Sequence, residues 1–144
     1  MNEVAPDTRV NLLGLERAGL EAFVSSMGNK PFRARQLMSW LYKRGEGDFA
    51  AMTDLARDFR AQLAEHAIVA TPEIISRHDS ADGTRKWLLR ADAGQAFEMV
   101  YIPETDRGTL CISSEVGCAL DCAFCSTAQQ GFNRNLVTAE IVGQ

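Results

Sequence analysis

The stretch Gly117-Cys118-Ala119-Leu120-Asp121-Cys122-Ala123-Phe124-Cys125 follows a predicted strand, Thr109 to Ser114, and decides how the fold is interpreted. Its three cysteines have the spacing C-x3-C-x2-C. Thiolates are soft ligands that select iron–sulfur clusters or zinc. Three of them can hold three corners of a cubane cluster and leave the fourth iron without a protein ligand. The spacing therefore predicts that Cys118, Cys122 and Cys125 bind a [4Fe–4S] cluster with one open iron.

Two other interpretations of the cysteines stay open at this point. A structural zinc site needs a fourth ligand to complete a tetrahedron, and none is well placed. Cys111 lies seven residues upstream within a predicted strand, and no histidine or further cysteine follows Cys125. Unligated cysteines packed in a core are the second alternative. Iron with an open position explains the spacing best.

Composition and the N-terminal residues limit the class of protein. With 144 residues and 46% apolar content, the chain can form one modest domain, or a small domain and the beginning of another. Its N-terminus carries acids and a proline instead of a basic flank and an apolar core, and no run of about 18 apolar residues follows. We therefore expect a cytosolic protein without a membrane span, where clustered cysteines indicate metal or redox chemistry rather than disulfides.

The first half of the chain predicts three amphipathic helices. The first has a stripe formed by Leu12, Leu15, Gly19, Ala22 and Phe23, and ends near Met27-Gly28. The second begins at Pro31 and ends at Gly45, and the third has Thr53 as its N-cap and ends near His66. His66 and His78 have no second ligand at helical or strand spacing, so we read both as surface or capping residues without a role.

The second predicted helix is basic although the chain carries a net charge of −4. Five cations and no acid lie between positions 30 and 44: Lys30, Arg33, Arg35, Lys43 and Arg44. They form either an RNA-phosphate contact or a solvated face that only aids solubility, and the sequence leaves both open. Trp40 and Tyr42 could stack on bases. We expect Trp40 in the core, since it lies beside the apolar stripe.

From Glu73 onward the pattern alternates with a period of two, which predicts a small antiparallel meander. Its parts are Ile74-Ile75, a turn at Asp82-Gly83, a strand Lys86 to Leu89, a turn at Asp92-Ala93-Gly94, and a strand Gln95 to Ile102. Alternation places Glu98 with Ala96, Val100 and Ile102 on an apolar face, where a carboxylate would lose its solvation. An acid that reaches solvent from an edge strand is the alternative.

Four segments together carry a resemblance to a known family. They are KPFRARQLMSWLY (30–42), SADGTRKW (80–87), FEMVYIP (97–103) and LCISSEVGCALDCAFCSTAQQGFNRNL (110–136). The cysteine loop, with the aromatic Phe124 just before its last cysteine, resembles that of radical S-adenosylmethionine enzymes. From about Asn11 onward the chain is similar to the RlmN family, the radical S-adenosylmethionine RNA methyltransferases that act on adenine C2.

The resemblance implies cofactors, substrates and partners. Cys118, Cys122 and Cys125 would ligate the cluster, with S-adenosylmethionine on the fourth iron and Phe124 near it. Two cofactor molecules would be used per turnover, one to methylate a cysteine near the C-terminus and one as the radical source. The substrates would be 23S rRNA and tRNA, the electron donor a protein such as flavodoxin, and the enzyme a cytoplasmic monomer without a membrane.

The same resemblance implies roles for two further residues. Matching the FEMVYIP-type and TLC-type motifs, Glu98 would accept the C2 proton, and Cys111 would be the resolving thiol that forms a transient disulfide. Alternation places Cys111 with Thr109 and Ser113 on a polar face, opposite Leu110 and Ile112. A small core residue or a stray cluster ligand are the alternatives for Cys111.

The resulting fold expectation is an α+β N-terminal part that leads into the start of a radical S-adenosylmethionine partial (β/α) barrel. Residues 1–68 would be a helical accessory RNA-binding domain, 69–107 a β meander that carries Glu98, and 108–144 the incomplete core domain. In barrels the chemistry gathers after the strands, and the cysteine loop follows the probable first strand. A helix capped by Thr138 would follow.

Three functions stay open for the chain. In the first, it is the N-terminal portion of a C2 methylase, which would be inactive by itself because the methyl-carrying cysteine would lie beyond Gln144. In the second, it belongs to a related C8-adenine methylase, although Ser126 to Gln130 look like the C2 group. In the third, it is a non-catalytic RNA-binding module.

Overall fold

The computed structural model describes residues 7–91, 94–120 and 122–144. The chain forms two compact units, Met1–Ala70 and Thr71–Gln144. The second unit contains both the meander and the cysteine loop. Within the described ranges, no helix is long and apolar enough to cross a membrane.

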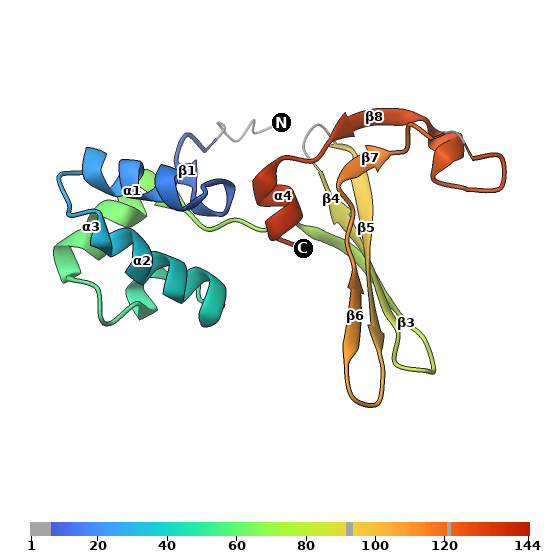
Figure 1. Ribbon diagram of the computed structural model, residues 1–144, viewed down its shortest axis with the longest axis horizontal. Coiled ribbons are helices and arrows are strands. Elements are labelled where there is room, and N and C mark those ends of the chain that lie inside the picture. The colour runs from blue at the N-terminus through green and yellow to red at the C-terminus, as the bar shows by residue number, and fades with distance from the viewer. Residues whose placement is uncertain (1–6, 92–93, 121) are drawn as a thin grey trace, which may run out of the picture. The chain divides into compact units, whose positions relative to one another are not determined.

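The first unit is helical and closes with a short parallel strand pair (Figure 1). Its elements are β1 (Val10–Asn11), the 3-10 turn η1 (Leu12–Gly14), α1 (Arg17–Ser26), α2 (Phe32–Met38), the π-helical turn η2 (Ser39–Lys43), the 3-10 turn η3 (Phe49–Ala51), α3 (Arg57–His66) and β2 (Ala67–Ile68). The Asn11 side chain fastens the end of this unit, because it donates to the Ala70 carbonyl at 2.8 Å and accepts the Ala70 N–H at 3.2 Å.

The start of the first helix differs from the prediction. Leu12 belongs to a 3-10 turn because the Asn11 side chain accepts the Leu13 N–H, and the α-helix begins only at Arg17 with Leu20 and Val24 buried. The stripe predicted from Leu12 to Phe23 was therefore wrong in its register. The predicted end of the helix is confirmed, because α1 ends at Ser26 and Gly28 has a left-handed φ of 75°.

Thr53 is not the cap of the third helix. α3 begins at Arg57, after Ala56. The preceding residues form a turn in which the Leu55 N–H donates to the Met52 carbonyl at 3.0 Å. This turn buries Met52 and Leu55 in the core, and that burial outweighs a helical cap at Thr53.

The second helix has the predicted extent, but its last turn is widened. In η2 the Arg44 N–H donates to the Ser39 carbonyl at 3.2 Å, and Gly45 follows with φ 63°. The widened turn holds Trp40, which is 8% exposed and donates its indole N–H to the Asp54 carboxylate. Trp40 is thus a core residue, as expected from its place beside the apolar stripe.

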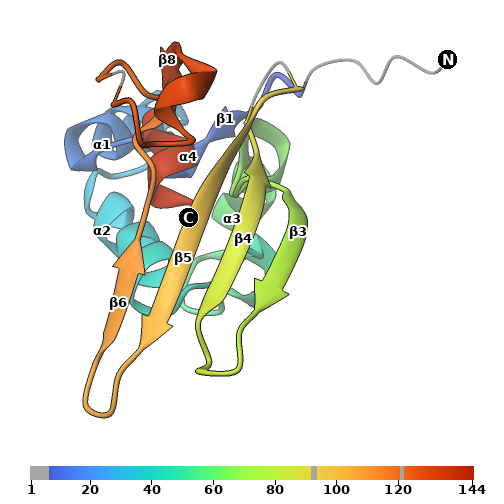
Figure 2. The same cartoon turned by 90° about the vertical axis from the view of Figure 1, so that its right-hand side faces the viewer.

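The second unit is built on a four-stranded antiparallel sheet with the order β3-β4-β5-β6 (Figure 2). The strands are β3 (Ile74–Asp79), β4 (Arg85–Arg90), β5 (Ala96–Pro103) and β6 (Gly108–Cys111). The predicted meander is confirmed. Its second predicted turn lies in part outside the described residues, at Asp92-Ala93.

One face of this sheet packs against other elements to form a core, and the other face does not. Leu89, Phe97 and Met99 form a core with Val116 and Leu136, and Ile141 of α4 (Thr138–Val142) packs against it. Figure 1 shows α4 on one side of the sheet and the loop after β7 (Glu115–Gly117) projecting to the other. The loop therefore lies on the side of the face that does not build this core.

The strand predicted at 109–114 is shorter, and a second strand follows it before the cysteine loop. β6 ends at Cys111 and remains in the antiparallel sheet, while β7 begins at Glu115 and directly precedes the cysteine loop. β7 pairs antiparallel with β8 (Phe132–Asn135). Across 7–91, 94–120 and 122–144 no parallel partner of β7 is formed, so the start of a barrel is not seen here.

Thr138 is the first residue of α4 and not its cap. Val137 takes the cap position, and its N–H donates to the Glu140 carboxylate at 2.9 Å. Glu140 stands three residues after the cap, where a carboxylate can reach back to the first free N–H groups of a helix. Arg134 of β8 pairs with the same carboxylate at 2.7 Å, which fastens α4 to the strand.

Gly117 closes the cysteine loop against the strand that follows it. It has φ 75°, and a Cβ there would lie 1.8 Å from the Gly131 carbonyl oxygen. That oxygen accepts the Cys118 N–H at 3.2 Å. Only glycine permits both the backbone conformation and this approach.

We expect Gly117→Ala to destabilise the second unit far more than Gly131→Ala. Gly131 also has a positive φ, 71°, but a Cβ there meets no atom within 4 Å. The Gly131 variant should cost about 1–2 kcal/mol from its backbone conformation alone. The Gly117 variant adds a clash and should expose the Cys118 amide. Urea unfolding and hydrogen exchange of that amide measure both effects, and equal losses for the two variants would contradict the constraint.

Candidate functional site

The three loop cysteines lie close in sequence but do not form a metal site in this conformation. Cys118, Cys122 and Cys125 are half-buried free thiols. In the part of the chain that the structure describes, no three His, Cys, Asp or Glu side chains are placed to hold a metal ion. Asp121, between the first two cysteines, lies outside the described residues.

The environment of Cys125 favours a thiolate. The backbone N–H groups of Ala128 and Thr127 donate to its sulfur, and together with the Thr127 side chain they lower the pKa of the Cys125 thiol. The Cys118 sulfur accepts the Leu120 N–H at 3.5 Å. Since metal ligation requires deprotonated cysteine, this donor set fits a cluster by its chemistry. Cluster binding would have to draw the three sulfurs together.

The apolar residues between the cysteines are open to solvent. Leu120 is 80% exposed and Phe124 is 93% exposed. Ala128, at the start of the 3-10 turn η5 (Ala128–Gln130), is by contrast 3% exposed and anchors the far end of the loop. A position of Phe124 near a cofactor stays a prediction.

Glu98 lies on β5 on the same face as Ala96, Val100 and Ile102, as the alternation predicted, but this is not the buried face of the sheet. Phe97 and Met99 are buried, so the odd-numbered positions of β5 face the core and Glu98 is exposed. The expectation of a desolvated carboxylate was wrong. The partner of Glu98 is instead Lys86 of β4, whose Nζ lies 2.7 Å from Glu98 Oε1, with the two side chains about half exposed.

Cys111 lies on the same face of the sheet as Glu98. It stands directly opposite Val100 in the β5–β6 register, and Glu98 is two residues from Val100. Directly opposed and alternate residues of antiparallel strands share a face. Leu110, on the opposite face of β6, is 54% exposed because the strand extends beyond the core.

A cavity of about 560 Å³ connects Glu98 to the cysteine loop. Lys86 and Glu98 line it from the sheet, and Ser126, Thr127 and Gln130, which follow Cys125, line it from the loop. Lys86 was missed by the sequence reasoning. Alternation along each strand could not have identified it, because which residues of two adjacent strands share a face depends on the register between the strands.

The structure divides the basic stripe into two groups. Arg33 lies over the Phe59 ring at 4.9 Å, and Arg44 over the Trp40 ring at 3.8 Å, with Asp54 at 4.0 Å. These two cations stabilise the unit itself. The remaining cations, Lys30, Arg35 and Lys43, are exposed, and no ion pair is recorded for them in the described ranges. Tyr42 beside them is 45% exposed.

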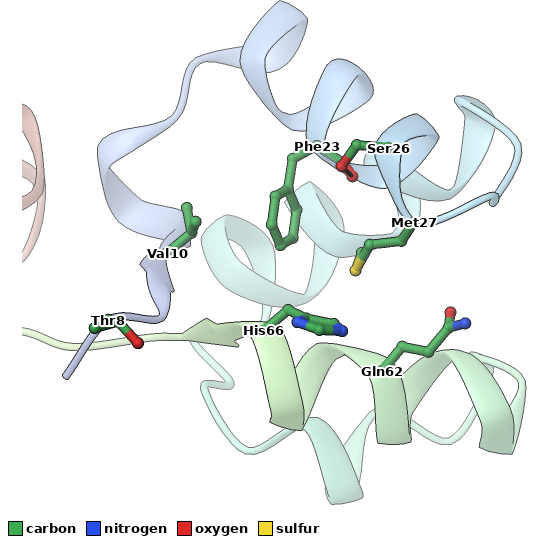
Figure 3. Close-up of a pocket in the computed structure, with 7 residues that line it drawn as sticks. All are labelled: Thr8, Val10, Phe23, Ser26, Met27, Gln62 and His66. Carbon is green, nitrogen blue, oxygen red and sulfur yellow. Dashed lines mark hydrogen bonds between the residues drawn. The ribbon is translucent and has the colours of Figure 1, made fainter.

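The first unit also contains a cavity of about 520 Å³ (Figure 3). Phe23 of α1, Met27 directly after this helix and Val10 form its apolar part, and Gln62 and His66 of α3 lie across from them. His66 Nε2 is 3.9 Å from the neighbouring Glu65 carboxylate. His78, the other histidine, is exposed on β3 opposite Lys86.

The chain is similar to known proteins over most of its length. Residues 10–69 match the model of the ribosomal RNA large subunit methyltransferase N-terminal domain. The dual-specificity RNA methyltransferase RlmN of Alkalilimnicola ehrlichii is 57% identical over 135 residues, which cover 94% of this chain and 38% of that protein.

The chain is also similar to a solved structure. The crystal structure of a radical SAM methyltransferase from Sphaerobacter thermophilus matches with a TM-score of 0.81 and 37% identity, over 92% of this chain and 39% of that one. The chain thus spans less than half the length of either protein. These findings support an N-terminal portion of an RlmN-type protein.

Proposed function

We propose that this chain supplies the cluster loop, a proton acceptor and a resolving thiol to a radical S-adenosylmethionine methyltransferase that acts on adenine C2 in 23S rRNA and tRNA. One observation carries the proposal. The cysteine loop projects to the side of the sheet that bears Glu98 and Cys111, and a single cavity joins Glu98 to that loop.

Cys118, Cys122 and Cys125 would hold the [4Fe–4S] cluster. When bound, the cluster supplies the electron that cleaves S-adenosylmethionine and so makes a radical attack on the electron-poor C2 possible. The backbone N–H groups of Ala128 and Thr127 lower the pKa of the Cys125 thiol, which favours the thiolate that metal ligation needs. The Gly117–Gly131 contact holds the ends of the loop together.

Glu98 and Cys111 would act after the methyl-carrying cysteine has joined the RNA. The radical adduct would return one electron to the oxidised cluster, and the Glu98 carboxylate takes the C2 proton, so that the adenine ring becomes aromatic again. The Cys111 sulfur forms an S–S bond with the carrier sulfur, the S–CH2 bond breaks, and the released carbon takes a proton to become the methyl group. Both side chains are exposed on one face, so a substrate base and the rest of the protein can reach them.

The first unit would dock the RNA through Lys30, Arg35 and Lys43, with Tyr42 available for stacking on a base. We leave Arg33 and Arg44 out of the proposed RNA contact, because their guanidinium groups lie over aromatic rings of the same unit. We place the protein in the cytoplasm as a monomer that receives electrons from a donor such as flavodoxin. The second unit would be extended by further chain into the partial (β/α) barrel.

Anaerobic reconstitution of the 144-residue chain with iron and sulfide tests the cluster. We expect about four irons per chain and a visible absorption band. Alanine at Cys118, Cys122 or Cys125 should remove both signals. Cys111→Ala is the matched control and should retain them, since Cys111 lies on β6 and not on the loop. Tight binding of zinc with no iron would contradict the proposal.

Substitution of the two reactive residues tests the resolution step. In a full-length protein with this sequence, Glu98→Gln and Cys111→Ala should lower methylation by a factor on the order of 10²–10⁴ and accumulate a covalent protein–RNA adduct. Denaturing gels and mass spectrometry of the RNA measure the two species. Glu104→Gln, an acid in the turn after β5 that pairs with Arg107, is the control. Full methylation by Glu98→Gln would remove Glu98 from the mechanism.

Charge reversal tests the RNA contact. Arg35→Glu should weaken RNA binding by the 144-residue chain and reduce the slope of log K against log salt by about 1 for each lost phosphate contact. Arg57→Glu, an equally exposed arginine at the start of α3, makes the same charge change away from the stripe. If both variants bind RNA alike, the stripe only aids solubility.

A further inference from the structure

We propose that Lys86 is a positioning residue for Glu98, holding its carboxylate at the cavity beside the cysteine loop. The inference rests on the proposed role of Glu98 as the acceptor of the C2 proton. It assigns Lys86 a part in adduct resolution, without contact with the reacting atoms.

The strand register creates the contact. Lys86 stands opposite Val100 and Glu98 opposite Leu88, so the two charged residues are diagonal neighbours on one face. A diagonal pair is too far apart for short side chains but within reach of a lysine. The Lys86 ammonium accordingly lies 2.7 Å from Glu98 Oε1.

Within the described ranges no other side chain is recorded as a partner of the Glu98 carboxylate. Leu88, directly opposite, is apolar and cannot donate a hydrogen bond. The Ser113 hydroxyl approaches from the next strand, but it donates to the Glu98 backbone carbonyl at 2.7 Å. The direction of the carboxylate therefore depends on Lys86.

The chemistry of the pair suits a proton acceptor. An ammonium has only donors, so it can contact the carboxylate only through an accepting oxygen. The bond engages Oε1, and no partner is recorded for Oε2 among the described residues, which leaves that oxygen available to accept. Both residues line the cavity that Ser126 and Thr127 close from the loop.

Half-exposed ion pairs contribute little to folding stability, so variants of Lys86 should remain folded. Two variants can then be compared in a full-length protein that contains this sequence. Lys86→Met keeps the aliphatic part of the side chain, and Lys86→Arg keeps the positive charge. Arg85→Met removes a cation from the adjacent position, which faces the other side of β4.

We expect Lys86→Met to slow adduct resolution by about tenfold, because a misplaced group loses the advantage of orientation. The covalent protein–RNA adduct should accumulate while RNA affinity stays at the wild-type value. Lys86→Arg should restore resolution in large part, and Arg85→Met should behave as wild type.

A second measurement uses the 144-residue chain and needs no turnover. The rate of Lys86 acylation by an amine-reactive ester, followed by mass spectrometry, reports whether the ammonium is engaged. Glu98→Gln should raise that rate several-fold and leave the rate at Lys43 unchanged. Equal rates at Lys86 in the two proteins would overturn the inference.

The outcomes separate this inference from the proposed function. If Glu98→Gln accumulates the adduct but Lys86→Met resolves it normally, the positioning role is wrong and the role of Glu98 stands. If Glu98→Gln resolves the adduct normally, the proposed function fails at Glu98 itself. If Lys86→Met weakens RNA binding without accumulating the adduct, Lys86 is a phosphate contact and the inference is wrong.

Discussion

The approach of Gly117 to the Gly131 carbonyl is the constraint on which the candidate site depends. It lets the chain leave β7, carry three cysteines through an exposed loop, and return at β8 with the Cys118 amide bonded to Gly131. Any side chain at position 117 would separate the two strands. The buried Ala128 and the bonds to the Cys125 sulfur act within this closed loop.

The two faces of the four-stranded sheet explain why the reactive residues gather where they do. One face buries Leu89, Phe97 and Met99 against α4 and β7, because apolar surface is removed from water there. The opposite face keeps Lys86, Glu98 and Cys111 accessible. In β4 and β5, buried apolar side chains thus alternate with more accessible ones.

The cations of the basic stripe fall into two groups, although the chain as a whole is acidic. Arg33 and Arg44 cover the rings of Phe59 and Trp40, and so contribute to the packing of the first unit. Lys30, Arg35 and Lys43 stay exposed on the same helical segment. A helix that reads as one basic stripe therefore has a structural part and a part free for an anionic partner.

The sequence by itself determined the helical first half, the antiparallel meander and the cysteine spacing, because these depend on local periodicity and on residue types. It misplaced Thr53 and Thr138 as caps, and took the face of Glu98 as the buried one, because burial of Met52, Leu55, Phe97 and Met99 and the reach of the Glu140 carboxylate are settled by distant contacts. Only the tertiary structure decided that Lys86 meets Glu98, since a diagonal pair depends on the register between strands.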